Sequence, residues 1–432
     1  MPWSSPSSCW PRSPRSARRA RNAPAPPPAK RAVPSRSPLA NTRPRDAVSL
    51  TGPARGEVCP MAATTHEVQE RVQEVLDRLV AQGRETGLQA AAYFQGELVA
   101  NAAAGTADPA ADKPLTPATL IHTFSTAKGV TATLTHAAAA RHGLDYDTPV
   151  AEYWPDFAAH GKERITLRHV LTHTAGVPHL PADTVPSHMA DWDAMCARIA
   201  GLTPLWEPGT AMGYHGWTFG WILGEVVRRV TGLPLAAALC DYVSGPLGIE
   251  DSLFFGLPGS EHHRTATLVD GGWDAAIASL PDSAAIFTAS PRPVAAGTEL
   301  GNQKNYLSAH VPAAGTMTAA AVARMYAALL PDTEGTHLLP AGTAKEAARL
   351  AVSDNDRILG HPSPKTLGYF HGITWAGGSP QSFGTTGSGG SAAFADPTHG
   401  IAFALTKNRL TADSYAAHTV AAELYAALGR TA

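Results

Sequence analysis

The 432-residue sequence is poor in cysteine and in charge. Its four cysteines form no C-x-x-C pair and two of them lie in the first sixty residues, so a disulfide framework is not expected and a reducing cytoplasm is the expected location. Charged residues make up 16% and hydrophobic residues 44%, a composition typical of a globular protein with a large core. No apolar run is long enough for a transmembrane helix, so membrane insertion is not expected.

Several signature motifs are also missing. The sequence contains neither a phosphate-binding loop nor a dinucleotide fingerprint after a strand. A nucleophile elbow is absent, because residues 389–393 (GGSAA) end in alanine instead of glycine. His169 and His173 have i, i+4 spacing but are accompanied by no H-E-x-x-H motif and no acidic third ligand. We therefore expect neither a cofactor nor a metal.

Basic and acidic residues are unevenly distributed. Residues 1–60 hold eleven Lys or Arg and two acidic residues, whereas the rest of the chain holds 23 basic and 34 acidic residues. The body is therefore acidic, which argues against nucleic acid as a partner. Residues 1–60 are rich in Pro, Arg, Ser and Ala, and we expect them to be disordered. They lack the apolar region of a signal peptide, and we expect the functional protein to begin near Met61.

Periodic patterns at both ends of residues 64–432 predict the secondary structure of one catalytic domain. A helix is predicted from Thr64, which forms a capping box with Glu67; its apolar stripe is Val68, Val72, Val75, Leu76 and Leu79. Residues 88–105 predict a β-hairpin that turns at Gln95-Gly96. Residues 391–408 predict two strands around Asp396-Pro397, followed by a helix over 414–429. The predicted α/β fold is a sheet built from both termini, with a mostly helical region of about 126–300 inserted.

The segment FSTAK places a lysine three residues after a serine, at the start of a helix of small apolar residues. On such a helix, Ser125 and Lys128 lie on the same face, one turn apart. The lysine can take the serine proton only if burial or nearby cations depress its pKa toward neutrality. The alternative is that Ser125 only caps the helix and Lys128 extends to solvent; the short pattern alone leaves this open.

Two further segments supply a resemblance: residues 165–178 (ITLRHVLTHTAGVP) and residues 202–248 (LTPLWEPGTAMGYHGWTFGWILGEVVRRVTGLPLAAALCDYVSGPLG). Together with FSTAK they closely resemble the serine β-lactamase and penicillin-binding protein superfamily, in its class C-like branch of family VIII carboxylesterases and related acyltransferases. The resemblance extends from about Thr64 to the C-terminus. It implies a β-lactamase/transpeptidase-like fold, in which helices flank an antiparallel sheet.

The resemblance also implies a set of catalytic residues. Ser125 matches the acylated nucleophile, Lys128 its base partner, and Tyr214 the tyrosine of the Y-x-N motif, which relays protons. The third motif, usually K-T-G or H-x-G, aligns with FGTTGSGG, giving the substrate-binding candidates Thr385, Thr386 and Gly387. The N–H groups of Ser125 and Ser388 would form the oxyanion hole.

This sequence departs from the lactamase pattern at two positions. Gly216 stands where β-lactamases have asparagine, and Thr385 stands where they have lysine. The first change removes a side-chain amide that would hold the acylamino group of a β-lactam, and the second removes a cation that would bind a substrate carboxylate. Both changes weaken the case for penicillin-type substrates. His215 and Trp217 beside Tyr214 are further candidates for substrate contact, and Trp217 could line an apolar pocket with Trp206 and Trp221. The segment 365–368 (KTLG) has an extra residue and no glycine-rich strand after it, so it is not taken as the third motif.

The sequence therefore predicts a serine hydrolase that forms an acyl-enzyme on Ser125, with a carboxylesterase favoured. The first alternative is an acyltransferase that passes the acyl group to an amine or alcohol in the synthesis of a small metabolite. A β-lactamase, a D-peptidase or a non-catalytic binding protein on the same fold are further alternatives. The expected partner is a small-molecule ester or amide, with an amine or alcohol as acceptor in the transferase case. Substrate identity and oligomeric state stay open.

Overall fold

The computed structural model describes residues 64–431. The expectations for residues 1–60, disorder and a functional start near Met61, fall outside these residues. The strands are β1 (Gly87–Phe94), β2 (Glu97–Asp108), β3 (Lys113–Pro114), β4 (Ile121–His122), β5 (Leu253–Phe254), β6 (Val269–Asp270), β7 (Thr316–Met317), β8 (Phe370–His371), β9 (Phe383–Thr386), β10 (Ala392–Asp396), β11 (Ile401–Lys407) and β12 (Arg409–Leu410). The α-helices are α1 (Thr65–Ala81), α2 (Ala127–His142), α3 (Val150–Tyr153), α4 (Leu167–Leu171), α5 (Pro186–Met189), α6 (Trp192–Ala200), α7 (Thr218–Thr231), α8 (Leu235–Leu239), α9 (Gly245–Leu247), α10 (Trp273–Ser279), α11 (Ile286–Ala289), α12 (Thr298–Gly301), α13 (Lys304–Ser308), α14 (Ala319–Ala327), α15 (Ala341–Ala348) and α16 (Tyr415–Ala427).

The elements predicted at the N-terminal end are confirmed. Thr64 caps α1 through the predicted capping box with Glu67, and the five residues of the apolar stripe are buried. β1 and β2 form the predicted hairpin. Its turn residues Gln95 and Gly96 have φ angles of 52° and 90°, the left-handed region that a two-residue hairpin turn requires.

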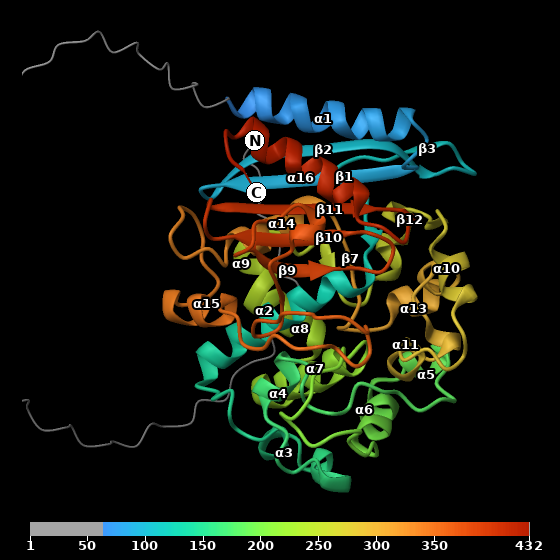
Figure 1. Cartoon of the computed structure of the whole chain (residues 1–432), viewed down its shortest axis with the longest axis vertical. Coiled ribbons are helices and arrows are strands. Elements are labelled where there is room, and N and C mark those ends of the chain that lie inside the picture. Colours follow the sequence, from blue (N-terminus) through green and yellow to red (C-terminus); the bar gives the residue numbers. More distant parts are fainter. Residues whose placement is uncertain (1–63, 432) are drawn as a thin grey trace, which may run out of the picture. The chain divides into compact units, whose positions relative to one another are not determined.

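The main sheet joins the two ends of the chain, as predicted. Its strand order is β3-β2-β1-β11-β10-β9-β8, and β1 from the N-terminal part pairs antiparallel with β11 from the C-terminal part. Alternate residues of each strand point to opposite faces. Leu88, Ala90 and Ala92 of β1 contribute to the core under α1 and α16, whereas Ala91 belongs to the larger core on the other face, which includes α14 (Figure 1).

The helical region follows β4 and contains α2 to α13 (Figure 1). Its first helix, α2, is buried on all sides over most of its length, which its small Ala, Gly and Thr side chains permit. Close packing is required at Gly129, where an added Cβ would lie 2.0 Å from the Tyr326 hydroxyl. The N-terminal part of α2 therefore packs closely against Tyr326 of α14 and Thr385 of β9. Among residues 64–431, no helix has the length and apolar character needed to cross a membrane.

Candidate active site

Ser125 and Lys128 meet at the start of α2. Ser125 lies in a single 3-10 turn, Phe124–Thr126, which leads directly into the helix. Lys128 Nζ donates hydrogen bonds to Ser125 Oγ (2.9 Å) and to the carbonyl oxygen of Ala313 (3.1 Å). The i, i+3 spacing thus places the amine beside the hydroxyl, and Lys128 does not extend to solvent: its exposed fraction is 2%.

The environment of Lys128 favours the neutral amine. Neither of its two hydrogen-bond partners carries a negative charge. Burial lowers the pKa of Lys128 to about 7, because the ammonium form loses its hydration. At neutral pH a substantial fraction of Lys128 is therefore able to accept a proton.

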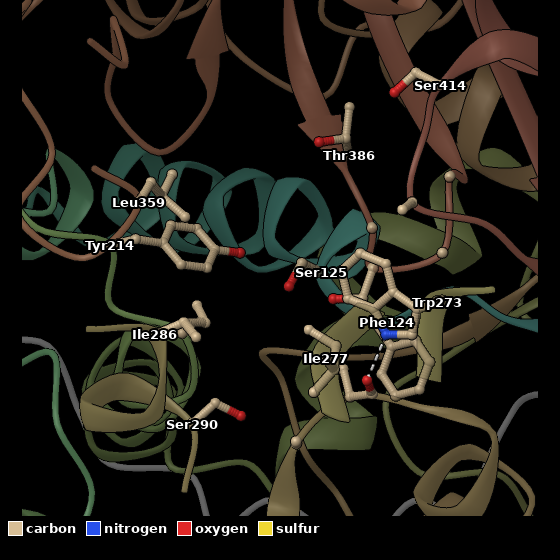
Figure 2. A pocket seen from close by; sticks show the side chains of 18 of the residues that line it. Phe124, Ser125, Tyr214, Trp273, Ile277, Ile286, Ser290, Leu359, Thr386 and Ser414 are labelled. Carbon is tan, nitrogen blue, oxygen red and sulfur yellow. Dashed lines mark hydrogen bonds between the residues drawn. The ribbon is translucent and has the colours of Figure 1, made fainter. Parts of the chain in front are cut away.

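Tyr214 completes this group from a distant part of the chain, the loop before α7. Figure 2 shows its hydroxyl pointing toward Ser125. Its ring centroid lies 5.0 Å from Lys128 Nζ. Burial raises the pKa of Tyr214 above its ordinary value, although a hydrogen bond with Ser125 acts in the opposite direction. Tyr214 therefore keeps its phenolic proton at neutral pH.

A glycine-rich turn after β9 approaches Ser125 from the sheet. Gly387 is needed there, because an added Cβ would lie 2.0 Å from the carbonyl oxygen of Thr123. The Gly387 N–H donates to the carbonyl of Ser391 (2.8 Å) and the Gly390 N–H to that of Gly387 (3.1 Å), which closes the turn. Ser388 lies between them and lines the same cavity as Ser125. Within residues 64–431, the Ser388 N–H has no hydrogen-bond acceptor.

Two predicted substrate contacts need correction. Thr385 lies on the face of β9 opposite to Thr386, so its hydroxyl donates to the carbonyl of Thr126 (2.7 Å) and is buried. His215 is fully buried; its Nδ1 donates to the Gly213 carbonyl (2.7 Å), and its Nε2 accepts the Val177 N–H (3.1 Å). Burial lowers the pKa of His215 to about 4. Both side chains support the site from behind and do not line the cavity.

The cavity in front of Ser125 has a volume of about 600 Å³. Trp217, Thr386, Gly387 and Ser388 are among its lining residues, whereas Trp221 is buried in the core. Its walls are mostly apolar and aromatic: Phe124, Tyr214, Trp217, Trp273, Ile277, Ile286, Phe287, Leu359, Phe370 and Trp375. No Lys or Arg is among the lining residues, and Asp413 is the one acidic residue.

Sequence reasoning missed much of this wall. Trp273 and Ile277 belong to α10, and Ile286 belongs to α11; Figure 2 shows them on the side of the cavity opposite Thr386. The segment that contains Leu359 and the strand residue Phe370 were also missed. None of these residues belongs to a recognisable motif, so only the tertiary structure identifies them.

Comparisons with known proteins identify the family and the fold. The model of the Beta-lactamase family matches residues 72–427. The chain is 33% identical to "Esterase/beta-lactamase LipL" of Mycobacterium tuberculosis over 344 residues, which is 74% of this chain and 76% of that protein. Among solved structures, a family VIII carboxylesterase superposes with a TM-score of 0.74 at 30% identity, covering 83% of this chain and 97% of the other. A penicillin-binding protein homologue from Caulobacter crescentus gives a TM-score of 0.72 at 32% identity, with 86% and 99% coverage.

The fold is β-lactamase/transpeptidase-like, and the esterase relatives support a serine hydrolase. The chain belongs to the beta-lactamase family. The proteins that it is similar to include members of the esterase branch that the sequence predicted.

Proposed function

We propose that the protein is a carboxylesterase that acts on uncharged esters through an acyl-enzyme on Ser125. The observation that carries the proposal is the buried Lys128 amine, hydrogen-bonded to the Ser125 hydroxyl at 2.9 Å without a carboxylate partner. A base that is neutral near pH 7 and already in contact with the hydroxyl is what activation of a serine requires.

The mechanism has two half-reactions. Neutral Lys128 accepts the Ser125 proton while Oγ attacks the ester carbonyl, and the N–H groups of Ser125 and Ser388 stabilise the oxyanion. When the C–O bond breaks, the Tyr214 phenol donates its proton to the departing alkoxide and recovers one from the protonated Lys128. Water then attacks the acyl-enzyme with the same groups as base and acid, which releases the carboxylic acid and restores Ser125.

The composition of the cavity supports an uncharged substrate. A carboxylate-bearing substrate would lose hydration on entering the apolar cavity, and no lining lysine or arginine would replace that hydration. The aromatic walls instead favour an apolar acyl or alcohol group. This also favours an ester over a β-lactam antibiotic, which carries a carboxylate.

The test is intact-protein mass spectrometry after mixing with p-nitrophenyl butyrate, with and without a panel of amines. We expect an acyl adduct that forms in the wild type, is absent in Ser125→Ala, and disappears in water. Ser414→Ala is the matched control, because Ser414 lines the same cavity and has no role in the mechanism. Persistence of the adduct until an amine is added would instead establish an acyltransferase. Failure of the wild type to form an adduct or release nitrophenol would count against the esterase.

A further inference from the structure

A buried ion pair lies behind Tyr214 and has no part in the mechanism above. Asp356 Oδ2 is 3.5 Å from Lys365 Nζ, and the side chains are 0% and 1% exposed. Removing two charges from water is costly, and such a pair is often less stabilising than apolar residues of similar volume. Its position next to Tyr214 raises the question of what the pair does there.

Asp356 holds the backbone of Tyr214. One carboxylate oxygen, Oδ1, accepts three N–H groups: Tyr214 (2.8 Å), Ile358 (2.9 Å) and Leu359 (3.0 Å). The Arg357 N–H also donates to the carbonyl of Met212 at 2.9 Å. The Tyr214 loop is therefore attached to the segment 356–359, although the two are far apart in the sequence and neither is part of a long strand or helix.

Lys365 supports the same arrangement from the other side. Its amine donates to the hydroxyl and carbonyl oxygens of Ser363 at 2.5 and 3.1 Å, and it lies 4.4 Å from the ring centroid of Phe370. Phe370 stacks on the Tyr214 ring, with the centroids 6.1 Å apart and the planes 21° from parallel. Lys365 thus balances the charge of the carboxylate that binds the Tyr214 backbone, and it contacts the ring that packs on the Tyr214 side chain.

We propose that Asp356 and Lys365 are positioning residues that hold Tyr214 at the distance and angle from Ser125 needed for proton transfer. The proposal rests on the proposed function of Tyr214 as the proton donor. Proton transfer depends steeply on geometry, and a displacement of about 1 Å can reduce a rate about 100-fold. The pair should therefore control kcat, while substrate binding depends on the apolar walls.

The first test is a double-mutant cycle with Asp356→Asn and Tyr214→Phe. Asparagine keeps an oxygen for the three N–H groups but loses the charge that faces Lys365, and phenylalanine keeps the backbone N–H. We expect Asp356→Asn to lower kcat for p-nitrophenyl butyrate about 10- to 100-fold, with KM changed less than twofold. In the Tyr214→Phe background the same change should cause no further loss, because there is no hydroxyl left to position. The proposal would be overturned if the losses in kcat from Asp356→Asn and Tyr214→Phe multiply in the double variant, or if Asp356→Asn changes mainly KM.

The second test uses the partner of Asp356 and a matched control. Lys365→Met leaves the carboxylate buried without a cation, so kcat should fall; Asp356→Asn combined with Lys365→Met should recover most of it, because both charges are gone and the amide oxygen still accepts the N–H groups. The control pair is Lys345 and Asp332, an exposed ion pair of the same composition (3.2 Å), for which the same substitutions should leave kcat unchanged. A double variant that is no better than Lys365→Met would overturn the proposal. If a single substitution prevents folding, kcat can still be measured in the double variant, in which both charges are gone.

Labelling of Ser125 by a fluorophosphonate, compared with kcat, separates the two proposals, because fluoride leaves without a proton from Tyr214. If the wild type neither hydrolyses esters nor is labelled, the proposed function fails. If the wild type is labelled and hydrolyses esters, but Asp356→Asn keeps the wild-type kcat, only the positioning role fails.

Discussion

Lys128 provides the sharpest prediction, because its environment determines the pH dependence of the reaction. With a pKa of about 7, roughly nine-tenths of Lys128 is neutral at pH 8 and roughly one-tenth at pH 6. Only the neutral amine can accept the Ser125 proton, so kcat/KM for acylation should fall about tenfold from pH 8 to pH 6. An unperturbed lysine, with its pKa of 10.5, would be almost fully protonated over this whole range.

The same shift has a consequence for stability. One pKa unit corresponds to about 1.4 kcal/mol, so a decrease from 10.5 to about 7 means that burying the ammonium costs on the order of 5 kcal/mol. Between pH 7 and 10.5 the unfolded chain binds a proton at Lys128 that the folded protein does not, so this group makes stability rise with pH in that window. Lys128→Met removes the titration. Relative to the wild type, it should therefore gain more thermal stability at pH 6 than at pH 9.5.

The assay is pre-steady-state acylation by a p-nitrophenyl ester, read at a wavelength where nitrophenol absorbance does not depend on pH. Lys128→Met should lose about 10²- to 10⁴-fold in rate, and its residual rate should lack the acid limb near pH 7. Lys365, whose pKa burial lowers to about 8, is the other buried lysine near the site. The variant carrying both Asp356→Asn and Lys365→Met is therefore the control, and it should keep the acid limb. A rate that is constant from pH 6 to 8, or a limb that persists in Lys128→Met, would refute the assignment of the base.

Four further predictions concern other parts of the site. Tyr214→Phe should lower kcat about 10²- to 10⁴-fold while the melting temperature, measured by circular dichroism, changes little; near-normal turnover would remove Tyr214 from the mechanism. Gly387→Ala should lower both activity and stability, the latter by about 1–3 kcal/mol in denaturant titration, because its Cβ would lie 2.0 Å from the Thr123 carbonyl oxygen. Ser388→Ala should keep both, because the proposed oxyanion donor is a backbone N–H; a large loss in Ser388→Ala would instead assign a role to its hydroxyl. A chromogenic cephalosporin should be turned over far more slowly than a butyrate ester, because no lysine or arginine lines the cavity to bind its carboxylate, and comparable rates would contradict the uncharged-substrate proposal.

The sequence predicted local features better than it predicted contacts between distant segments. The capping box of α1, the hairpin turn at Gln95-Gly96 and the two C-terminal strands were predictable, because each depends on interactions between neighbouring residues. The third motif at FGTTG was also recognised, but not which of its two threonines faces the cavity. That choice depends on which face of β9 lies against α2, and the sequence of β9 does not specify it. His215 was misjudged for a similar reason, since its neighbour Tyr214 reaches the cavity while His215 points into the core.

The spacing of Ser125 and Lys128 was enough to place them on the same face of one helical turn, because residues three apart on a helix lie side by side. It was not enough to predict that Lys128 is buried or that its pKa is lowered. Both follow from groups of distant segments that surround the amine, including the carbonyl of Ala313 and the ring of Tyr214. The attachment of Tyr214 to Asp356 likewise exists only after the chain has folded. Spacing along the chain fixes which groups are neighbours on one helix, whereas pKa and orientation depend on solvent exclusion and on contacts between distant segments, which only the tertiary structure supplies.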